Sequence, residues 1–163
     1  MSATDKLLEN NEAYAERFEG GDLPLPPAKK VAVIACMDAR LVPSEVLGLS
    51  EGDAHVIRNP GGVVTDAEIR ALAISQRKLG TEEIVLIHHT DCGMLGFSDE
   101  EFAAQLESET GTAPGFAGHS FDDHEADIRD AIGRIKSSPF ILHKDSVRGF
   151  VYEVESGRLR EVE

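Results

Sequence analysis

The sequence has no tryptophan, only two cysteines and no long uninterrupted run of apolar residues. Two cysteines cannot supply the set of disulfides that holds a small secreted domain together. No apolar stretch approaches the roughly 20 residues that a membrane-spanning helix needs. What is left is a globular composition, and for 163 residues we expect one domain over 1–163.

Basic residues are also scarce, with 16 Lys and Arg against 30 Asp and Glu, which gives a net charge of −14. Such a field repels phosphate backbones and anionic lipid, so neither nucleic acid nor a membrane surface is an expected partner. The segment Met1–Gly20 lacks the basic start and apolar run of a secretory signal. We therefore expect a cytoplasmic protein, in which two reduced cysteines indicate a metal site or catalysis.

Apolar runs alternate with helix signals along the chain, which predicts an α/β fold with an open, mostly parallel sheet and flanking helices. The expected strands are Val31–Ala35, Ala54–Ile57, Ile84–Ile87, Gly149–Val154 and Leu159–Val162, the last antiparallel to the one before it. The expected helices are 5–18, a short turn at 44–47, 66–79, 99–109 and 122–136. Capping-box patterns at Thr65 and Ser98 mark two of the helix starts.

Residues 1–28 are predicted to form an N-terminal helix followed by a proline-rich extended arm. The helix carries apolar side chains on one face, among them Leu7 and Phe18. Such a face must be buried, either on the chain's own core or on a second subunit.

The two cysteines and one histidine fall at the ends of predicted strands. Cys36 follows the first strand, whereas His89 and Cys92 follow the third. If the first and third strands are neighbours in a parallel sheet and the second lies outside the first, the gap between their ends is the point where the winding direction reverses, and the two segments meet there. Two thiolates and one imidazole suit Zn²⁺ and leave a fourth coordination position open, which indicates chemistry rather than a purely structural role.

Asp38 and Arg40 stand two and four positions after Cys36, so in an extended segment all three side chains would point the same way. Arg40 can hold Asp38 by a bidentate contact that keeps the carboxylate ionised. The carboxylate can then accept the hydrogen of a hydroxide generated at zinc. If Arg40 releases it, Asp38 can instead bind zinc as a fourth ligand and close the site.

The pattern Cys-x-Asp-x-Arg followed by His-x-x-Cys, each after a buried strand, resembles the β-class carbonic anhydrases, in particular their compact members. The segment Arg58–Gly62 is similar to a loop that usually reads Arg-Asn-Ala-Gly in that family, from which Pro60 departs. The resemblance implies a sheet ordered 2-1-3-4 with an antiparallel fifth strand. It also implies a homodimer or higher homo-oligomer, in which the N-terminal helix packs on the partner.

The resemblance further implies reversible hydration of carbon dioxide to bicarbonate and a proton, by attack of hydroxide generated at zinc. The zinc ligands that it implies are Cys36, His89 and Cys92. Asp38 and Arg40 carry over as the catalytic pair, with Asp38 a ligand in the closed state only, and Gly93 as a lining of the substrate pocket. One subgroup binds bicarbonate in a regulatory pocket built around a tryptophan, which this chain lacks.

Several alternatives stay open on the sequence alone. Hydrolysis of carbonyl sulfide or carbon disulfide uses the same metal residues on the same fold. A zinc-holding regulatory module without turnover is a second possibility, and a redox dithiol is a third, although the chain has no Cys-x-x-Cys. His88 is expected to point away from His89, and Asp91 to form a turn or accept a hydrogen bond rather than bind metal.

Overall fold

The computed structural model covers residues 1–163 and contains one five-stranded sheet in the order β2-β1-β3-β4-β5. The strands are β1 (Val31–Cys36), β2 (Ala54–Asn59), β3 (Glu83–His89), β4 (Val147–Tyr152) and β5 (Leu159–Val162). The first four strands run parallel, whereas β5 pairs antiparallel with β4. This topology confirms the predicted order and the antiparallel edge strand.

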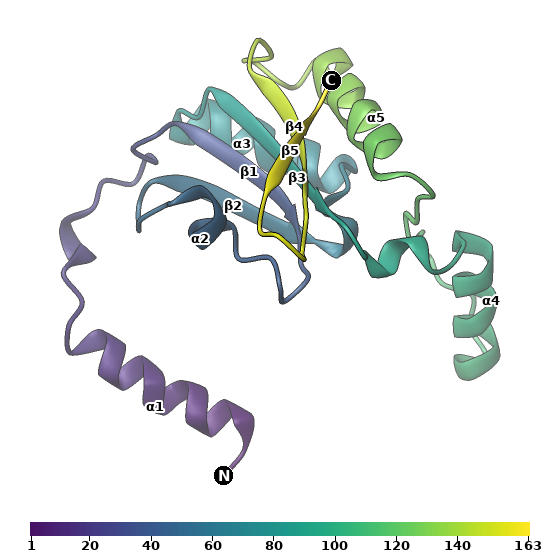
Figure 1. The fold of residues 1–163 in the computed structure, drawn as a ribbon, viewed down its shortest axis with the longest axis horizontal. Coiled ribbons are helices and arrows are strands. Elements are labelled where there is room, and N and C mark those ends of the chain that lie inside the picture. The colour runs from purple at the N-terminus through teal and green to yellow at the C-terminus, as the bar shows by residue number, and fades with distance from the viewer.

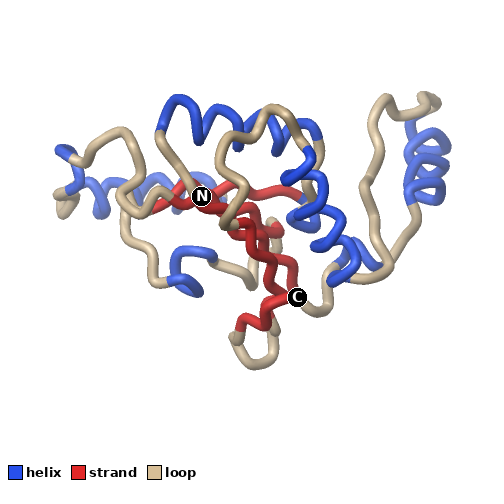
Figure 2. Tube along the Cα trace, turned by 90° about the horizontal axis from the view of Figure 1, so that it is seen from above, coloured by secondary structure: helices blue, strands red, loops and turns tan.

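Helices cover both faces of the sheet (Figures 1 and 2). The helices are α1 (Ala3–Ala15), α2 (Pro43–Leu47), α3 (Asp66–Leu79), α4 (Asp99–Thr110) and α5 (His124–Ser137). Strand side chains alternate between the faces, so Ile34 packs in one cluster with α3 and α5, whereas Val33 packs in another with α2. None of the helices combines the length and the apolar character needed to cross a membrane.

A tight turn at Pro60–Gly62 connects β2 to α3 and lies across the ends of β1 and β3. Gly62 has φ +75°, and a Cβ atom there would lie 2.9 Å from both the Cys36 nitrogen and the Ile87 oxygen. Only glycine combines this left-handed backbone with such a close approach. The turn therefore rests directly on the backbone next to two of the predicted metal ligands.

The predicted element bounds shift by a few residues for identifiable reasons. A capping box between Ser2 and Asp5 starts α1 at Ala3, and the helix ends at Ala15, so Phe18 lies beyond it. Strand β4 begins at Val147 because that residue pairs with Ile84 of β3. The capping boxes predicted at Thr65 and Ser98 are both confirmed.

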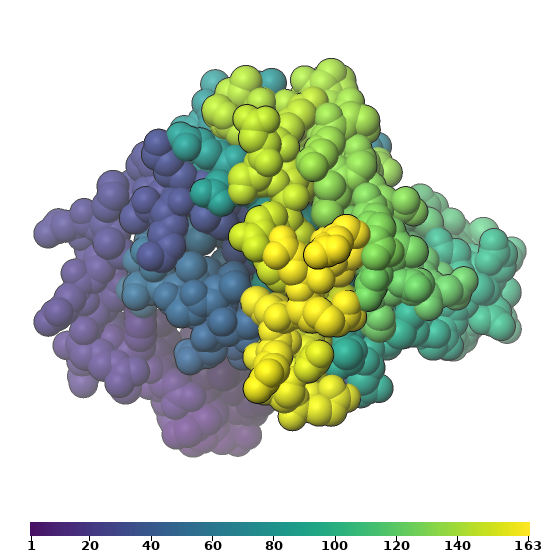
Figure 3. All heavy atoms as spheres, turned by 45° about the horizontal axis from the view of Figure 1, so that its top comes forward, coloured from purple at the N-terminus to yellow at the C-terminus, as the bar shows by residue number.

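The N-terminal arm stands apart from the sheet. Helix α1 has no buried residue, and in the space-filling view the N-terminal residues, in purple, extend along one side of the molecule (Figure 3). Leu7 and Leu8 are 65% and 61% exposed, respectively. The arm's apolar face is therefore not buried by the chain's own core.

Candidate metal centre

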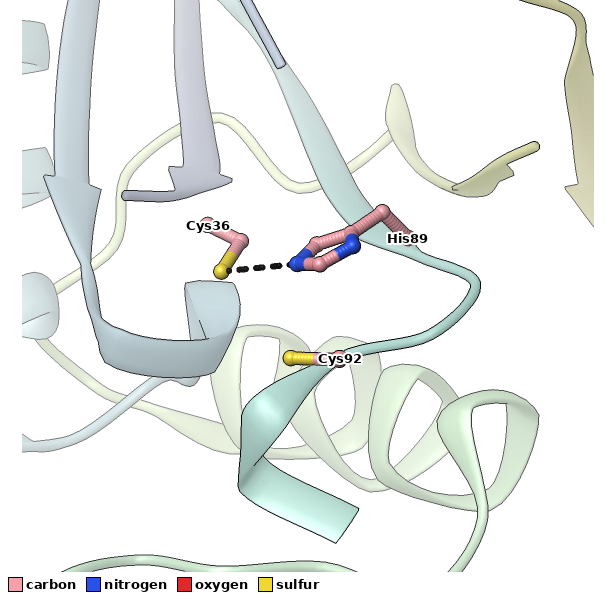
Figure 4. Close-up of side chains that lie close together, drawn as sticks. All are labelled: Cys36, His89 and Cys92. Carbon is pink, nitrogen blue, oxygen red and sulfur yellow. Dashed lines mark hydrogen bonds between the residues drawn. The ribbon is translucent and has the colours of Figure 1, made fainter. Parts of the chain in front are cut away.

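Cys36, His89 and Cys92 converge at the carboxyl ends of β1 and β3, as the strand pattern predicted. Cys36 is the last residue of β1 and His89 the last of β3, and Cys92 lies in the loop that follows (Figure 4). Their ligand atoms all lie within 4.8 Å of one another, and His89 Nε2 lies 3.1 Å from Cys36 Sγ. All three residues are buried. They can therefore share one ion.

The imidazole of His89 is oriented by the main chain. Its Nδ1 lies 2.8 Å from the carbonyl oxygen of Thr90. Because a carbonyl oxygen can only accept, Nδ1 carries the hydrogen, and the neutral ring then presents the lone pair of Nε2 towards Cys36. The Thr90 hydroxyl is itself fixed, since it accepts from the Val154 nitrogen and donates to Glu155. This arrangement selects the tautomer that binds a metal through Nε2.

The two thiols differ in acidity because they share a proton. The pKa of Cys36 is lowered to about 4, chiefly because the Cys92 thiol donates a hydrogen bond to the Cys36 thiolate, while burial acts in the opposite direction. When the His89 ring carries a proton on both nitrogens, its Nε2 also donates to this thiolate and lowers the pKa further. The pKa of Cys92 is raised, first by that same hydrogen bond and then by burial. One thiolate is therefore ready as a ligand, and a bound cation would displace the proton of the other.

The donor set fits zinc. Tetrahedral zinc with bonds of about 2.0–2.3 Å separates its ligand atoms by roughly 3.5–3.8 Å. The observed spacing is compatible with that geometry after small side-chain adjustments. The site opens into a cavity of about 180 Å³, whose lining includes the apolar side chains of Met37, Pro60 and Met94 as well as Gly93. A fourth position beside the three donors therefore adjoins a small cavity with a partly apolar lining.

Asp38 and Arg40 form the predicted pair, but on a turn rather than on an extended segment. The Leu41 nitrogen donates to the Asp38 carbonyl, which closes the turn. Arg40 Nε and Nη2 donate to the two oxygens of Asp38 at 3.0 and 2.8 Å, and the Arg40 main-chain nitrogen donates as well. These hydrogen bonds hold the pKa of the Asp38 carboxyl well below its usual range. Asp38 Oδ2 also lies 3.7 Å from His89 Nε2, so an ionised carboxylate borders the metal centre.

Arg58 supports this turn from the neighbouring strand β2, which sequence reasoning missed. Its guanidinium donates to the carbonyl oxygens of Cys36, Asp38 and Leu41 at 2.7–3.1 Å. The sequence placed Arg58 in a loop, whereas it is the fifth residue of β2 and pairs in register with Ala35. The signal in the sequence that could have identified Arg58 is an arginine in the strand next to the one that ends at Cys36.

Two neighbours of the ligands behave as expected. His88 is fully buried but points to the opposite side, where its Nε2 lies 2.7 Å from an Asp127 oxygen of α5. Asp91 is not among the residues whose ligand atoms cluster, and it accepts a hydrogen bond from Arg40 instead. The three candidate ligands are therefore Cys36, His89 and Cys92, and neither His88 nor Asp91 is one of them.

Comparison with known proteins agrees with this geometry. The model of the carbonic anhydrase family matches residues 31–113. This range contains the three candidate ligands together with Asp38, Arg40 and Arg58, but not Asp127, Val154 or Glu155. Beta-carbonic anhydrase 1 of Mycobacterium tuberculosis is 52% identical over 162 residues, covering 99% of each chain. A carbon disulfide hydrolase of an Acidianus strain is 32% identical, covering 96% of this chain and 87% of its own length.

The fold is shared as well. A solved structure of carbonic anhydrase from Streptococcus mutans is 43% identical and superimposes with a TM-score of 0.94. The match covers 100% of this chain and 99% of the other. The similarity to carbonic anhydrases, in sequence and in structure, therefore extends over the whole chain, including the arm and the edge strand.

Proposed function

Because the chain belongs to the β-class carbonic anhydrases, we propose that it is a carbonate dehydratase that reversibly hydrates carbon dioxide to bicarbonate and a proton. Zinc would be held by Cys36, His89 and Cys92. The observation that carries the proposal is the convergence of these three donors within 4.8 Å, with the Asp38 carboxylate 3.7 Å from His89 Nε2. A purely structural site has no need of the Asp38–Arg40 pair, which speaks against a non-catalytic zinc module.

The roles of the side chains follow from their chemistry. When bound, zinc lowers the pKa of a coordinated water towards neutrality and so supplies the nucleophile. The Asp38 carboxylate, ionised because Arg40 donates to both of its oxygens, can only accept a hydrogen bond and so orients that nucleophile. Met37 and Met94 line the cavity with apolar surface that suits a small uncharged substrate. Gly93 contributes backbone without a side chain, which leaves room beside Cys92.

The direct test is stopped-flow carbon dioxide hydration by zinc-loaded wild-type protein and by Asp38→Asn. The amide is nearly isosteric but presents N–H donors where the carboxylate only accepts. We expect full zinc content and a loss of kcat/KM of about 10² or more, the range for removal of a proton-handling group. Full activity in Asp38→Asn would remove Asp38 from the mechanism, and an inactive, zinc-replete wild type would refute the proposal itself.

Carbon disulfide hydrolysis is the second candidate, favoured by the 32% identity to the Acidianus enzyme. The same nucleophile would attack a carbon flanked by sulfur rather than oxygen. Release of hydrogen sulfide from carbon disulfide or carbonyl sulfide, compared with carbon dioxide hydration on one protein sample, separates the two functions. Sulfide release without carbon dioxide hydration would assign the chain to the second.

The exposed arm supports a homodimer. Leu7 and Leu8 of α1 are well exposed although apolar, so a second copy of the chain is the simplest cover for them. We expect deletion of Met1–Gly20 to lower the sedimentation coefficient to that of a monomer, whereas a Lys6→Ala control should sediment like wild type. An unchanged dimer after the deletion would show that the arm does not hold the dimer together.

The need for reduced thiols favours a cytoplasmic location.

A further inference from the structure

Asp91 makes two contacts with Arg40 that the mechanism above does not use. Arg40 Nη1 donates to the Asp91 carboxylate at 2.7 Å, and Arg40 Nη2 donates to the Asp91 main-chain oxygen at 3.0 Å. The two residues are separated by 51 positions in the sequence. Asp91 lies between His89 and Cys92, so this contact links the loop of the third candidate ligand to the turn that follows the first.

The backbone of Asp91 is in an unusual conformation. Its φ is +53°, in the left-handed region that residues with a Cβ atom seldom adopt. Aspartate and asparagine tolerate this region better than other non-glycine residues. In this conformation the carboxylate and the carbonyl of the same residue both reach one guanidinium group. Strained backbone of this kind persists where the surrounding contacts require it.

Arg40 uses the rest of its guanidinium to hold Asp38. Nη2 is shared, because it donates to Asp38 Oδ2 at 2.8 Å as well as to the Asp91 carbonyl oxygen. Asp91 therefore fixes the position of the same group that keeps the Asp38 carboxylate in place. That carboxylate is only 3.7 Å from His89 Nε2, so a small rotation without Arg40 would bring it among the metal ligands.

We propose that Asp91 is a positioning residue that anchors Arg40 and thereby keeps Asp38 away from the fourth coordination position of the metal. The inference rests on the proposed function, because it concerns how that site stays open. Weakening the anchor should let Asp38 occupy the fourth position more often. The apparent Kd of a small ligand that needs this position would then rise, because it equals the intrinsic Kd divided by the fraction of molecules in which Asp38 leaves the position free.

The test uses the zinc-loaded protein and azide, a small linear anion that binds at an open metal position. Asp91→Asn keeps a residue that tolerates positive φ but removes the charge, whereas Asp91→Gly also removes the contact to Nη1. The Asp91 side chain is 73% exposed, and exposed ion pairs couple weakly. We therefore expect the Kd for azide to rise about two- to fivefold in Asp91→Asn, and further in Asp91→Gly.

A matched control removes a similar ion pair elsewhere. Asp66 accepts from Arg134 at 2.6 Å and is highly exposed, so Asp66→Asn should leave azide binding unchanged. The decisive arm repeats Asp91→Asn in an Asp38→Ala background, where no carboxylate can block the metal. There the effect on azide should vanish. Persistence of the effect without Asp38, or a loss of zinc in both Asp91 variants, would overturn the proposal.

The result can be separated from the fate of the proposed function. Wild-type protein that hydrates carbon dioxide, together with azide affinity unaffected by Asp91→Asn, removes only the role of Asp91. Wild-type protein that binds azide at its zinc but hydrates no carbon dioxide removes the proposed function, while the azide measurements still decide whether Asp91 controls access to the metal.

Discussion

Replacing Gly62 with alanine should damage both stability and metal binding, because this glycine touches the backbone beside the metal centre. An added Cβ would lie 2.9 Å from the Cys36 nitrogen, 2.9 Å from the Ile87 oxygen and 3.1 Å from the Ala35 carbonyl carbon. All three are backbone atoms of paired strands, which cannot rotate away as a side chain can. Relief requires β1 and β3 to move relative to the turn.

The size of the effect can be worked out from these contacts. Left-handed alanine costs roughly 1–2 kcal/mol, and overpacking adds typically 1–3 kcal/mol, so we expect a loss of about 2–5 kcal/mol in the free energy of unfolding. Reaching an ordinary contact of 3.4 Å from 2.9 Å needs a shift of 0.5 Å beside Cys36. The backbone that carries the Cys36 thiolate would move with this shift, so zinc affinity should fall as well.

The assay is urea unfolding of Gly62→Ala followed by circular dichroism, with zinc affinity measured by competition against a chelating dye. Gly80→Ala is the matched control, because Gly80 has φ +74° but a methyl group added there would meet no atom within 4 Å. This control should lose only the roughly 1–2 kcal/mol of the backbone conformation and keep its zinc affinity. Equal losses in the two variants would refute the steric argument.

Two further predictions concern coordination and pH. Cys92→Ser should bind far less zinc than wild type, because serine offers no thiolate, and a zinc-replete serine variant would contradict the proposed coordination. The pKa of Glu68 is lowered despite its burial, which acts to raise it, because hydrogen bonds from Thr65 and Asn59 outweigh that burial. The ionised carboxylate therefore stabilises the fold above the ordinary pKa of 4.5, and this contribution is lost as the pH falls through the lower folded value. The difference in unfolding free energy between wild type and Glu68→Gln should accordingly be present at pH 7 and shrink below pH 4.5; a pH-independent difference would disprove it.

The strands and the three candidate ligands could be predicted because each leaves a local signal. Buried parallel strands appear as apolar runs, and the residues that end them must meet at one edge of the sheet. Cys36 and His89, which are 53 positions apart, could thus be placed at the same edge of the sheet, together with Cys92, without knowledge of the loops between them. The order of the strands came from the family resemblance, since periodicity alone does not specify which strands are neighbours.

The supporting contacts could not be predicted because they depend on turn geometry. The turn from Asp38 to Leu41 was expected to be extended, and only its actual shape brings the main-chain nitrogen and guanidinium of Arg40 onto one carboxylate. Arg58 and Asp91 reach this turn from β2 and from the loop after β3. Charged residues on such segments have no periodic pattern, and their partners follow only from the folded backbone.

These contacts imply that the metal centre is largely formed before metal binds. Arg58 holds the turn after Cys36, Gly62 closes over β1 and β3, and Thr90 orients His89. The core beside it, which includes Ile34, Leu72, Ile84, Leu86 and Ile135, contains none of the candidate ligands, and each such side chain contributes about 1.5–3 kcal/mol on burial.

Removal of zinc should therefore leave the protein folded, in contrast to small domains that unfold without their metal. At a free zinc concentration of about 100 times Kd, binding adds roughly 2.7 kcal/mol. For a chain of this size each kcal/mol shifts Tm by about 2–4 °C, so a chelator should lower Tm by roughly 5–10 °C and leave the far-ultraviolet circular dichroism spectrum unchanged at 25 °C. If the chelator abolished the spectrum, the bound metal, rather than Arg58, Gly62 and the core, would be what holds the ends of β1 and β3 together.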